Sequence, residues 1–299
     1  MEHVPVLLHE VITFLGPRPG DFIIDGTVDG GGHAREILGR ITETGTLLGL
    51  DWDEALLAEC RARIGGYKNA ILVHGNYADL PEIMAERAAA LPARQADGLL
   101  VDLGFSSEQL EASGRGFSFG GSSKDEPLLM TYDDSRPPVS AIIRELPEDD
   151  LANVIYEFGG ERYSRRIAKA IKERGRRKPI MTNGELAETV RSAVSHGYER
   201  GRIDAATRTF QALRIYANGE LDNLKTLLER LPDIVKPGGR VAIITFHSLE
   251  DRIVKEKFRE MAKRGTVEIV TKKPIPASRG EIVQNPRSRS AKLRALKIL

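Results

Sequence analysis

Short apolar runs alternate with helical stretches through the first hundred residues, and this alternation restricts the chain to few folds. The apolar runs have the length of buried strands, and a segment with helical spacing of apolar residues follows most of them. The predicted strands are residues 22–27, 46–51, 70–74 and 97–103, and the predicted helices start near His33 and cover residues 53–64 and 81–91. Such strand–helix units predict an α/β fold, a doubly wound sheet with mainly parallel strands.

The alternation stops after the fourth strand. Residues 104–134 are rich in Gly, Ser, Phe and acids without a regular period, which predicts a long loop. Helical periodicity then predicts helices at 147–158, 162–174, 183–195 and, as one long helix, 207–231. Further strands are expected at 240–246, 267–271 and 293–298, with a capping box at Ser248-Leu-Glu-Asp251 opening a helix to about Lys263. We therefore expect a discontinuous domain, 1–104 and 206–299, interrupted by an inserted loop and small helical domain at 105–205.

Composition excludes several classes of protein. No apolar run approaches the ~18 residues of a membrane-spanning helix, and the N-terminus lacks the features of a signal peptide. The single cysteine, Cys60, excludes an intramolecular disulfide and a cysteine-rich metal site. The six histidines are scattered singly, so we expect no metal site. The sequence therefore predicts a cytoplasmic protein without a membrane partner.

Charge is divided unevenly along the chain. Residues 1–158 carry 12 basic and 27 acidic residues, whereas residues 159–299 carry 32 basic and 16 acidic residues. The segment 161–178 alone has nine basic residues against two acidic ones. An anionic partner, above all nucleic acid, would explain this asymmetry, and so would a set of solvated helix faces.

A glycine-rich turn, Asp25-Gly-Thr-Val-Asp-Gly-Gly-Gly-His33, follows the first strand, where open α/β sheets bind ligands. The spacing differs from the G-x-G-x-x-G of dinucleotide enzymes, and Asp25 and Asp29 would repel phosphates, which disfavours a nicotinamide dehydrogenase. A cofactor with positive charge and no phosphate, such as S-adenosylmethionine, suits the turn better. Asp51 ends the second strand, where a carboxylate can accept both ribose hydroxyls. A tight turn and a polar strand end would explain either feature alone.

Longer motifs make the chain recognisable, and it resembles the RsmH (MraW) family of small-subunit ribosomal-RNA methyltransferases. The matching strings are His3-Val-Pro-Val-Leu-Leu8, Asp25–His33, Asp97-Gly-Leu-Leu-Val-Asp-Leu-Gly-Phe-Ser-Ser107, Arg115-Gly-Phe-Ser-Phe119, Glu161-Arg162, Arg165-Arg-Ile-Ala168, Ala206-Thr-Arg-Thr-Phe-Gln-Ala-Leu-Arg-Ile215, Phe246-His-Ser-Leu-Glu-Asp-Arg-Ile-Val-Lys255 and Asn285-Pro-Arg-Ser-Arg-Ser290. The resemblance implies a Rossmann-like class I methyltransferase with an inserted helical domain.

The resemblance also implies an activity and its participants. Family members methylate the exocyclic N4 of a cytidine in the decoding region of 16S rRNA, with S-adenosylmethionine as cofactor and the small ribosomal subunit as partner. The positions that match the family's cofactor contacts are Gly31, Gly32, His33, Asp51, Tyr77, Asp102 and Gln109, to which we add Asp25 from the turn. A homodimer is compatible with the sequence.

Asp102, at the end of the fourth strand, is the first candidate for a catalytic residue, ahead of Ser106 and Ser107. A carboxylate that accepts a hydrogen bond from the cytosine amino group would raise the reactivity of that amine. An aspartate at a strand end is equally suited to hold a cofactor or to form a turn. The candidates for RNA binding are Arg115, Phe117, Arg208 and Arg214, with burial in a loop as the alternative for Phe117.

Three departures from the family pattern leave an alternative open. Asp29 stands where the family usually has glycine, and Pro127-Leu-Leu-Met-Thr-Tyr-Asp133 replaces Pro-Leu-Asp-Met-Arg-Met-Asp. Likewise Asp204-Ala205 replaces His-Pro. These changes would permit a non-catalytic RNA-binding or ribosome-assembly factor on the same fold, whereas the retained Asp51, Asp102 and Gln109 favour an active enzyme.

Overall fold

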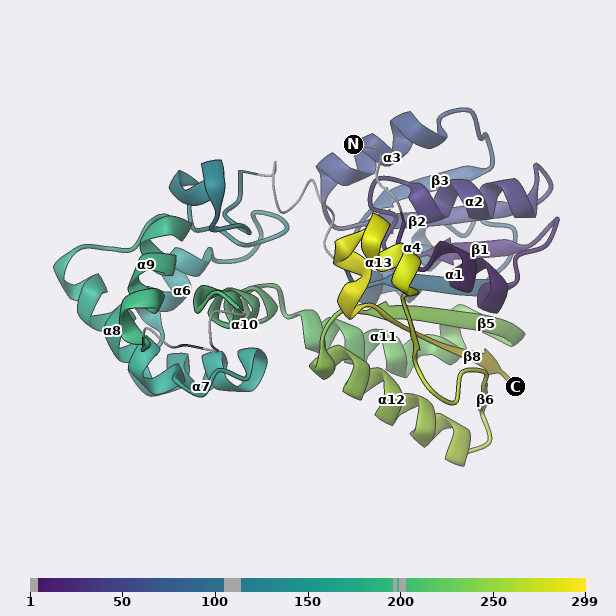
Figure 1. Ribbon diagram of the computed structural model, residues 1–299. Helices are drawn as coiled ribbons and strands as arrows, with labels where there is room; N and C mark the ends of the chain where they lie inside the picture. Colours follow the sequence, from purple (N-terminus) through teal and green to yellow (C-terminus); the bar gives the residue numbers. More distant parts are fainter. Residues whose placement is uncertain (1–4, 105–113, 196–197, 199–202) are drawn as a thin grey trace. The chain divides into compact units, whose positions relative to one another are not determined.

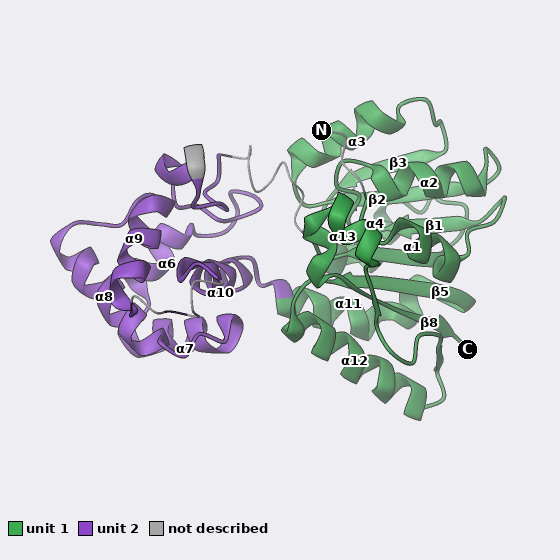
Figure 2. Cartoon of the chain, in the orientation of Figure 1, with its two compact units in different colours: residues 1–104, 221–299 green, residues 105–220 purple. Residues whose placement is uncertain are grey.

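The computed structural model describes residues 5–104, 114–195, 198 and 203–299. The chain divides into two compact units, residues 1–104 with 221–299 and residues 105–220 (Figures 1 and 2). The second boundary thus lies at residue 220, where we expected 205. Helix α10 (Ala206–Asn218) accounts for the difference, because its buried residues pack into the hydrophobic core of the second unit.

The first unit is built on one sheet, and its topology confirms the predicted doubly wound α/β fold. The strands are β1 (Phe22–Asp25), β2 (Thr46–Asp51), β3 (Ala70–His74), β4 (Ala96–Asp102), β5 (Val235–Thr245), β6 (Val267–Ile269), β7 (Ile275–Pro276) and β8 (Lys292–Ile298). Their order is β3-β2-β1-β4-β5-β8-β6, with β7 paired to β8. The first five strands pair in parallel, and β8 runs antiparallel to its neighbours.

The strand order reverses between β1 and β4, because the chain proceeds from β1 outward to β3 and then returns to the other side of β1. Open α/β sheets bind ligands at such a switch point, beyond the carboxyl ends of the strands. The fold therefore places the ends of β1 and β4 at the expected ligand position.

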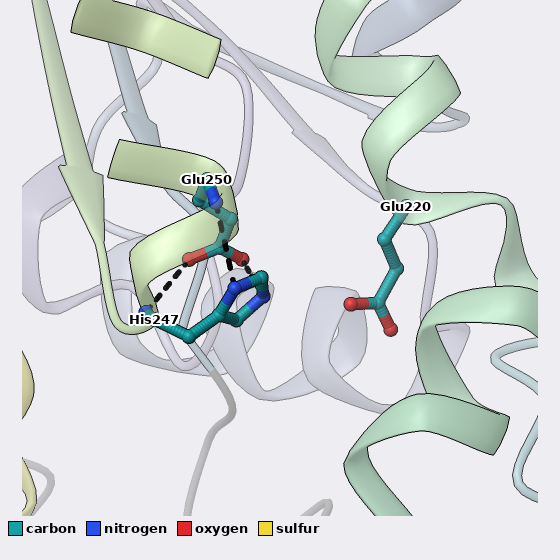
Figure 3. A group of neighbouring side chains, drawn as sticks. All are labelled: Glu220, His247 and Glu250. Atoms are coloured by element: carbon teal, nitrogen blue, oxygen red, sulfur yellow. Dashed lines mark hydrogen bonds and ion pairs between the residues drawn. The ribbon is translucent and has the colours of Figure 1, made fainter. Parts of the chain in front are cut away.

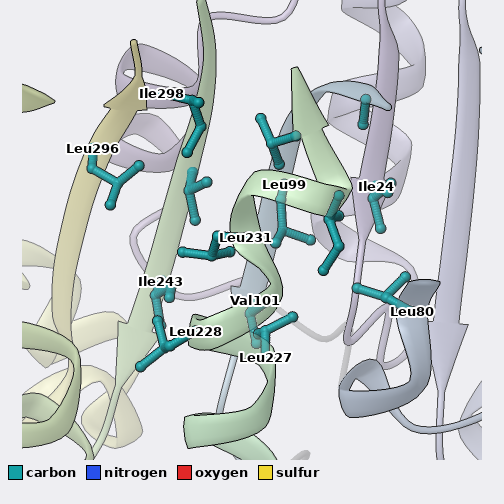
Figure 4. Close-up of a cluster of buried hydrophobic side chains, with 14 of the residues drawn as sticks. Ile24, Leu80, Leu99, Val101, Leu227, Leu228, Leu231, Ile243, Leu296 and Ile298 are labelled. Atoms are coloured by element: carbon teal, nitrogen blue, oxygen red, sulfur yellow. The ribbon is translucent and has the colours of Figure 1, made fainter. Parts of the chain in front are cut away.

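Helices cover both faces of the sheet. The helices are α1 (Leu8–Leu15), α2 (Gly32–Ile41), α3 (Glu54–Ile64), α4 (Leu80–Glu86), α11 (Glu220–Ile234), α12 (Ser248–Lys263) and α13 (Arg279–Gln284). Successive residues along a strand point to opposite faces, so Leu99 and Val101 pack with α4, α11 and α12 while Leu100 packs with α1, α2 and α3. Figure 4 shows the first of these clusters. Because both faces are apolar, the central strands are continuous hydrophobic runs, as is typical of buried parallel sheets.

The second unit is a small helical domain in the part that the structure describes. Its helices are α6 (Val139–Glu145), α7 (Glu148–Gly159), α8 (Ser164–Arg177), α9 (Asn183–Ala193) and α10, and their apolar faces share one core. The predicted loop is largely irregular where it is described, apart from a 3₁₀ helix over Gly121–Asp125. No helix among the described residues is long and apolar enough to span a bilayer.

Two details of the predicted helices are wrong. The long helix over 207–231 is two helices, since Gly219 adopts a left-handed conformation with φ of 62° and separates α10 from α11. The capping box of α12 starts one residue earlier than predicted, at His247, whose Nδ1 accepts from the amide of Glu250. The carboxylate of Glu250 accepts in return from the amides of Phe246 and His247. Figure 3 shows His247 and Glu250 with the interactions between them.

Asn218, at the end of α10, ties the segment Pro127–Asp133, which differs from the family pattern, to that helix within the second unit. Its Nδ2 donates to the carbonyl of Met130 at 2.9 Å, and its Oδ1 accepts from the amide of Tyr132 at 3.0 Å. The side chain is fully buried. Loss of this side chain would deprive the carbonyl of Met130 and the amide of Tyr132 of these hydrogen bonds at a buried position.

We therefore expect Asn218→Ala to destabilise the protein by about 2–3 kcal/mol. Urea unfolding followed by circular dichroism measures the change, with Asn153→Ala on the exposed side of α7 as a matched control. Equal unfolding midpoints for the two variants would contradict this account of the segment.

Candidate functional site

Three buried carboxylates end three neighbouring strands. Asp25 ends β1, Asp51 ends β2 and Asp102 ends β4. Their exposed fractions are 0%, 7% and 6%. Because these strands are parallel and adjacent, their carboxyl ends meet at one edge of the sheet, beside the switch point.

Backbone amides orient the carboxylate of Asp51. Its Oδ2 accepts from the amide of Asp29 and its Oδ1 from the amide of Asp53, both at 2.9 Å. Asp29 has a φ of 46°, in the left-handed region that favours glycine. This conformation gives a physical reason for the glycine that the family usually has there, and it aims the Asp29 amide at Asp51.

Asp102 is held by the turn that follows β1. Its amide donates to Oγ1 of Thr27 at 2.7 Å, and its Oδ1 accepts from the amide of Gly104 at 3.2 Å. Nδ1 of the buried His33 lies 3.9 Å from its Oδ2, while Nε2 of His33 lies 2.9 Å from the carbonyl oxygen of Val6. His33 thus lies beside Asp102, and its ring is fixed from the opposite side.

Asp25 retains a buried acceptor without a protein partner. Its Oδ1 accepts from the amide of Thr27 at 3.2 Å, whereas its Oδ2 has no hydrogen-bond partner among the described residues. A buried acceptor without a partner is costly and rare in native proteins. Its position among the strand ends fits a bound hydrogen-bond donor.

Burial raises the pKa of all three carboxyl groups. Desolvation is the largest cause in each case, and it raises the pKa of Asp51 and of Asp102 to about 7. The pKa of Asp25 is raised well above its usual value, with the charges of Asp102 and Asp51 adding to the effect of burial. A site of this kind favours a ligand that brings positive charge.

The glycines of the turn permit close packing. Gly31 has a φ of 83°, and a Cβ built on it would lie 3.1 Å from Sγ of Cys60. A Cβ on Gly32, the first residue of α2, would lie 2.8 Å from Pro5. Both glycines are therefore required by the packing around the turn, and their contact with a cofactor stays a prediction.

The residues present fit S-adenosylmethionine. This cofactor carries a sulfonium and an ammonium group, which carboxylates attract, and ribose hydroxyls, which the oriented Asp51 can accept as hydrogen bonds. A dinucleotide would instead bring its pyrophosphate close to acidic side chains. The geometry thus agrees with the cofactor that the motifs imply.

Comparison with known proteins decides the family. The model of the MraW methylase family matches residues 1–299. The chain belongs to this family. Its membership confirms the family that the motifs predict and, with it, the cofactor S-adenosylmethionine.

Curated relatives match over almost the whole chain. A protein named ribosomal RNA small subunit methyltransferase H from Syntrophotalea carbinolica is 44% identical over 100% of this chain and 98% of its own length. A protein of the same name from Syntrophobacter fumaroxidans is 41% identical, covering 99% of this chain and 96% of its own. A solved structure of an rRNA methylase from Streptococcus thermophilus is 9% identical, with a TM-score of 0.45 over 99% of this chain and 98% of its own.

Of the remaining cofactor candidates, the structure describes Tyr77 but not Gln109. Tyr77 starts a 3₁₀ helix after β3, and its Cβ would lie 3.3 Å from a Cβ built on Gly26. It is therefore next to the turn after β1, which is compatible with a contact to an adenine ring. Gln109, Ser106 and Ser107 lie outside the described residues.

The four predicted RNA-binding residues are engaged inside the second unit. Arg115 donates to the carbonyls of Thr131 and Asp133, and Phe117 is buried in the core. Arg208 donates to the hydroxyl of Tyr198, and Arg214 forms a two-bond ion pair with Glu220. Their placement favours a structural role for all four, and for Phe117 it agrees with the alternative of a buried loop residue.

Sequence reasoning missed the role of Thr27. Its hydroxyl accepts from the amide of Asp102, and its own amide donates to Asp25, so it joins β1 to β4 at the switch point. The available signal was a threonine two residues after the acid that ends the first strand. His247 and Glu250, drawn in Figure 3, follow β5, the strand next to β4, and the charge of Glu250 contributes to the raised pKa of Asp102. Glu220, also drawn there, belongs to the second unit.

The raised pKa values predict that cofactor affinity depends on pH. Asp51 and Asp102 titrate near pH 7 in the free protein, and a cationic ligand favours their ionised forms. We therefore expect the affinity for S-adenosylmethionine to rise from about pH 6 to about pH 7.5, with release of protons on binding. Isothermal titration calorimetry in buffers of different ionisation enthalpy measures both quantities.

S-adenosylhomocysteine is the matched control, because it lacks the sulfonium charge. Its affinity should change less over the same range of pH. An equal pH dependence for the two ligands would contradict the role given to these carboxylates.

Proposed function

We propose that this protein transfers a methyl group from S-adenosylmethionine to the exocyclic N4 of a cytidine in the decoding region of 16S rRNA. Family membership and the relatives named above support an rRNA methyltransferase. The observation that carries the finer proposal is the buried carboxylate of Asp102 at the end of β4, beside the switch point and with a pKa near 7.

The chain's own residues position the cofactor. Asp51 accepts hydrogen bonds from the ribose hydroxyls, and its orientation by two amides makes this acceptor rigid. The free Oδ2 of Asp25 is suited to a cationic donor. When bound, S-adenosylmethionine supplies an electrophilic methyl group, which an in-line nucleophile displaces from sulfur.

Asp102 acts on the nucleophile. The lone pair of the cytosine N4 is delocalised into the ring, so the free amine attacks weakly. A carboxylate that accepts a hydrogen bond from this amine concentrates charge on nitrogen as the carbon–nitrogen bond forms and the carbon–sulfur bond breaks. The proton lost by nitrogen passes to the carboxylate or to water, and a pKa near 7 suits Asp102 to this exchange.

The single cysteine argues for N4 rather than the ring carbon C5. C5 of cytosine becomes nucleophilic only after a nucleophile, commonly a thiolate, adds to the ring. Cys60 is the chain's one cysteine, it is fully buried under the turn, and burial raises its pKa to about 12. Direct attack by the exocyclic amine needs no such nucleophile.

The test uses small ribosomal subunits that lack the modification. With tritium-labelled S-adenosylmethionine, we expect label in 16S rRNA of these subunits and none in large subunits. Cofactor binding without transfer to subunits or to naked 16S rRNA would contradict the proposal and favour the assembly factor.

A further inference from the structure

The proposed function leaves one cluster of exposed residues in the second unit without a role. A cavity of about 330 Å³ lies between α7 and the start of α8, and we call it the α7–α8 pocket. Its lining residues are Asn153, Tyr156, Arg162, Tyr163, Ser164, Arg165 and Arg166. The volume is within the range of sites that hold a small organic ligand. Three arginines and two tyrosines line it, and none of its described lining residues is a carboxylate.

Tyr156 gives the pocket an accessible aromatic face. The residue is 61% exposed, although a large aromatic ring is usually covered in a folded domain. Tyr163, by contrast, is partly buried and packs against Tyr198 with ring centroids 6.1 Å apart. Tyr156 is thus free to receive a second ring, while Tyr163 is part of the wall.

The ring of Tyr163 holds Arg162 and Arg166 in place, but their charges are not balanced by an ion pair among the described residues. The guanidinium groups of Arg162 and Arg166 lie over the ring of Tyr163, at 5.1 and 5.8 Å from its centroid. No ion pair joins either of them to a carboxylate among the described residues. Arg165 pairs with Asp149, but both side chains are more than two-thirds exposed, so this pair is weak and open to exchange.

Two of the arginines also interact unfavourably with the dipole of the helix that carries them. Arg165 and Arg166 lie in the first turn of α8, which holds no acidic residue, and the dipole of a helix disfavours positive charge at that end. A bound anion would offset the mutual repulsion of the arginines. Cations beside an exposed aromatic ring are the chemistry that recognises an unpaired nucleotide, whose phosphates bind arginine and whose base stacks.

We infer that the α7–α8 pocket binds one unpaired nucleotide of the RNA substrate, with its base on Tyr156 and its flanking phosphates on Arg162 and Arg166. The inference rests on the proposed function only in taking RNA as the substrate. It assigns to the second unit an RNA contact apart from the four residues that the sequence suggested. The pocket holds the RNA and takes no part in methyl transfer.

Binding of a fluorescently labelled, single-stranded 12-nucleotide RNA of mixed C and U to the full chain tests the inference. We expect Tyr156→Ala to weaken binding about 10-fold and Tyr156→Phe, which keeps the ring, to bind within about 2-fold of the unaltered protein. The double variant Arg162→Ala/Arg166→Ala should weaken binding at least about 10-fold and reduce its salt dependence. An abasic oligomer of the same length has no base to stack on Tyr156. It should therefore bind the unaltered protein and Tyr156→Ala with the same affinity.

Arg177→Ala is the matched control for charge. Arg177 is exposed at the far end of the same helix, about 17 Å along its axis from Arg166. Its replacement should change the affinity for the RNA by no more than about 2-fold. Tyr156, Arg162 and Arg166 are exposed, so thermal unfolding should be unchanged in all variants. Pocket variants that bind like Arg177→Ala, or an abasic oligomer that binds as well as the RNA, would overturn the inference.

Methyl transfer measured on the same variants separates this inference from the proposed function. If the unaltered protein transfers no methyl group while the pocket variants lose RNA binding, the proposed function fails and the pocket stands. If transfer occurs and the pocket variants bind RNA normally, the pocket fails and the proposed function stands. When both hold, the pocket variants should raise KM for small subunits and leave kcat unchanged.

Discussion

Replacement of Asp102 by alanine should lower kcat for methyl transfer at least about 100-fold, the usual scale for loss of a group that exchanges a proton with the reacting atom. The carboxylate is 6% exposed at the end of β4, and burial raises its pKa to about 7. Asp102→Asn should be nearly as inactive, because an amide accepts a hydrogen bond but cannot take up the proton. Single-turnover transfer of labelled methyl to unmodified small subunits measures the effect.

Asp97→Ala is the control for Asp102→Ala, because Asp97 lies near the opposite end of the same strand. It accepts from the amide of Phe22 at 2.9 Å and pairs with Lys236, so its loss should lower stability but not kcat. Calorimetry on Asp102→Ala shows whether the cofactor still binds. Turnover within about 3-fold of the unaltered protein would contradict a catalytic role for Asp102.

Asp51→Asn should weaken binding of S-adenosylmethionine by about 10- to 100-fold, the scale of hydrogen bonds to a charged acceptor. The variant keeps the shape of the side chain and loses its charge. Asp53→Asn is the matched control, because Asp53 caps α3 by accepting from the amide of Ala55, and asparagine caps equally well. Calorimetric titration of both variants measures the difference.

The same Asp51→Asn substitution should remove a fall in the stability of the ligand-free protein with rising pH. Burial raises the pKa of Asp51 from 3.8 to about 7, so the folded state holds a proton that the unfolded state has lost. The free energy of unfolding therefore falls as pH rises between these two values, and the variant lacks this fall. A stability loss at pH 8 together with unaltered cofactor affinity would show that Asp51 is structural.

Much of the fold follows from local sequence signals. Short, continuous apolar runs bounded by glycine and acids predict β1 to β4, because a buried parallel strand must be apolar on both faces. The break at Gly219 was missed, since the residues on both sides have helical spacing and only the left-handed backbone of one glycine separates them. The cap at His247 was missed because Ser248 is the commoner capping residue, while the structure uses the imidazole.

The candidate site was predictable where it depends on topology. Acids that end adjacent parallel strands must meet at one edge, which is why Asp25, Asp51 and Asp102 could be placed together. The RNA-binding residues depended on tertiary partners that the sequence does not display. Arg214 has its partner Glu220 only six residues away, across the unexpected helix break, and the exposure of Tyr156 follows from how α7 packs.

Nucleoside analysis of the methylated product tests the central claim most directly. Small subunits lacking the modification are incubated with the protein and labelled S-adenosylmethionine, and the rRNA is digested to nucleosides and separated by mass spectrometry. The account predicts label in N4-methylcytidine from 16S rRNA and its loss with Asp102→Ala. Label in 5-methylcytidine or in a 2′-O-methylated nucleoside would contradict the proposed chemistry.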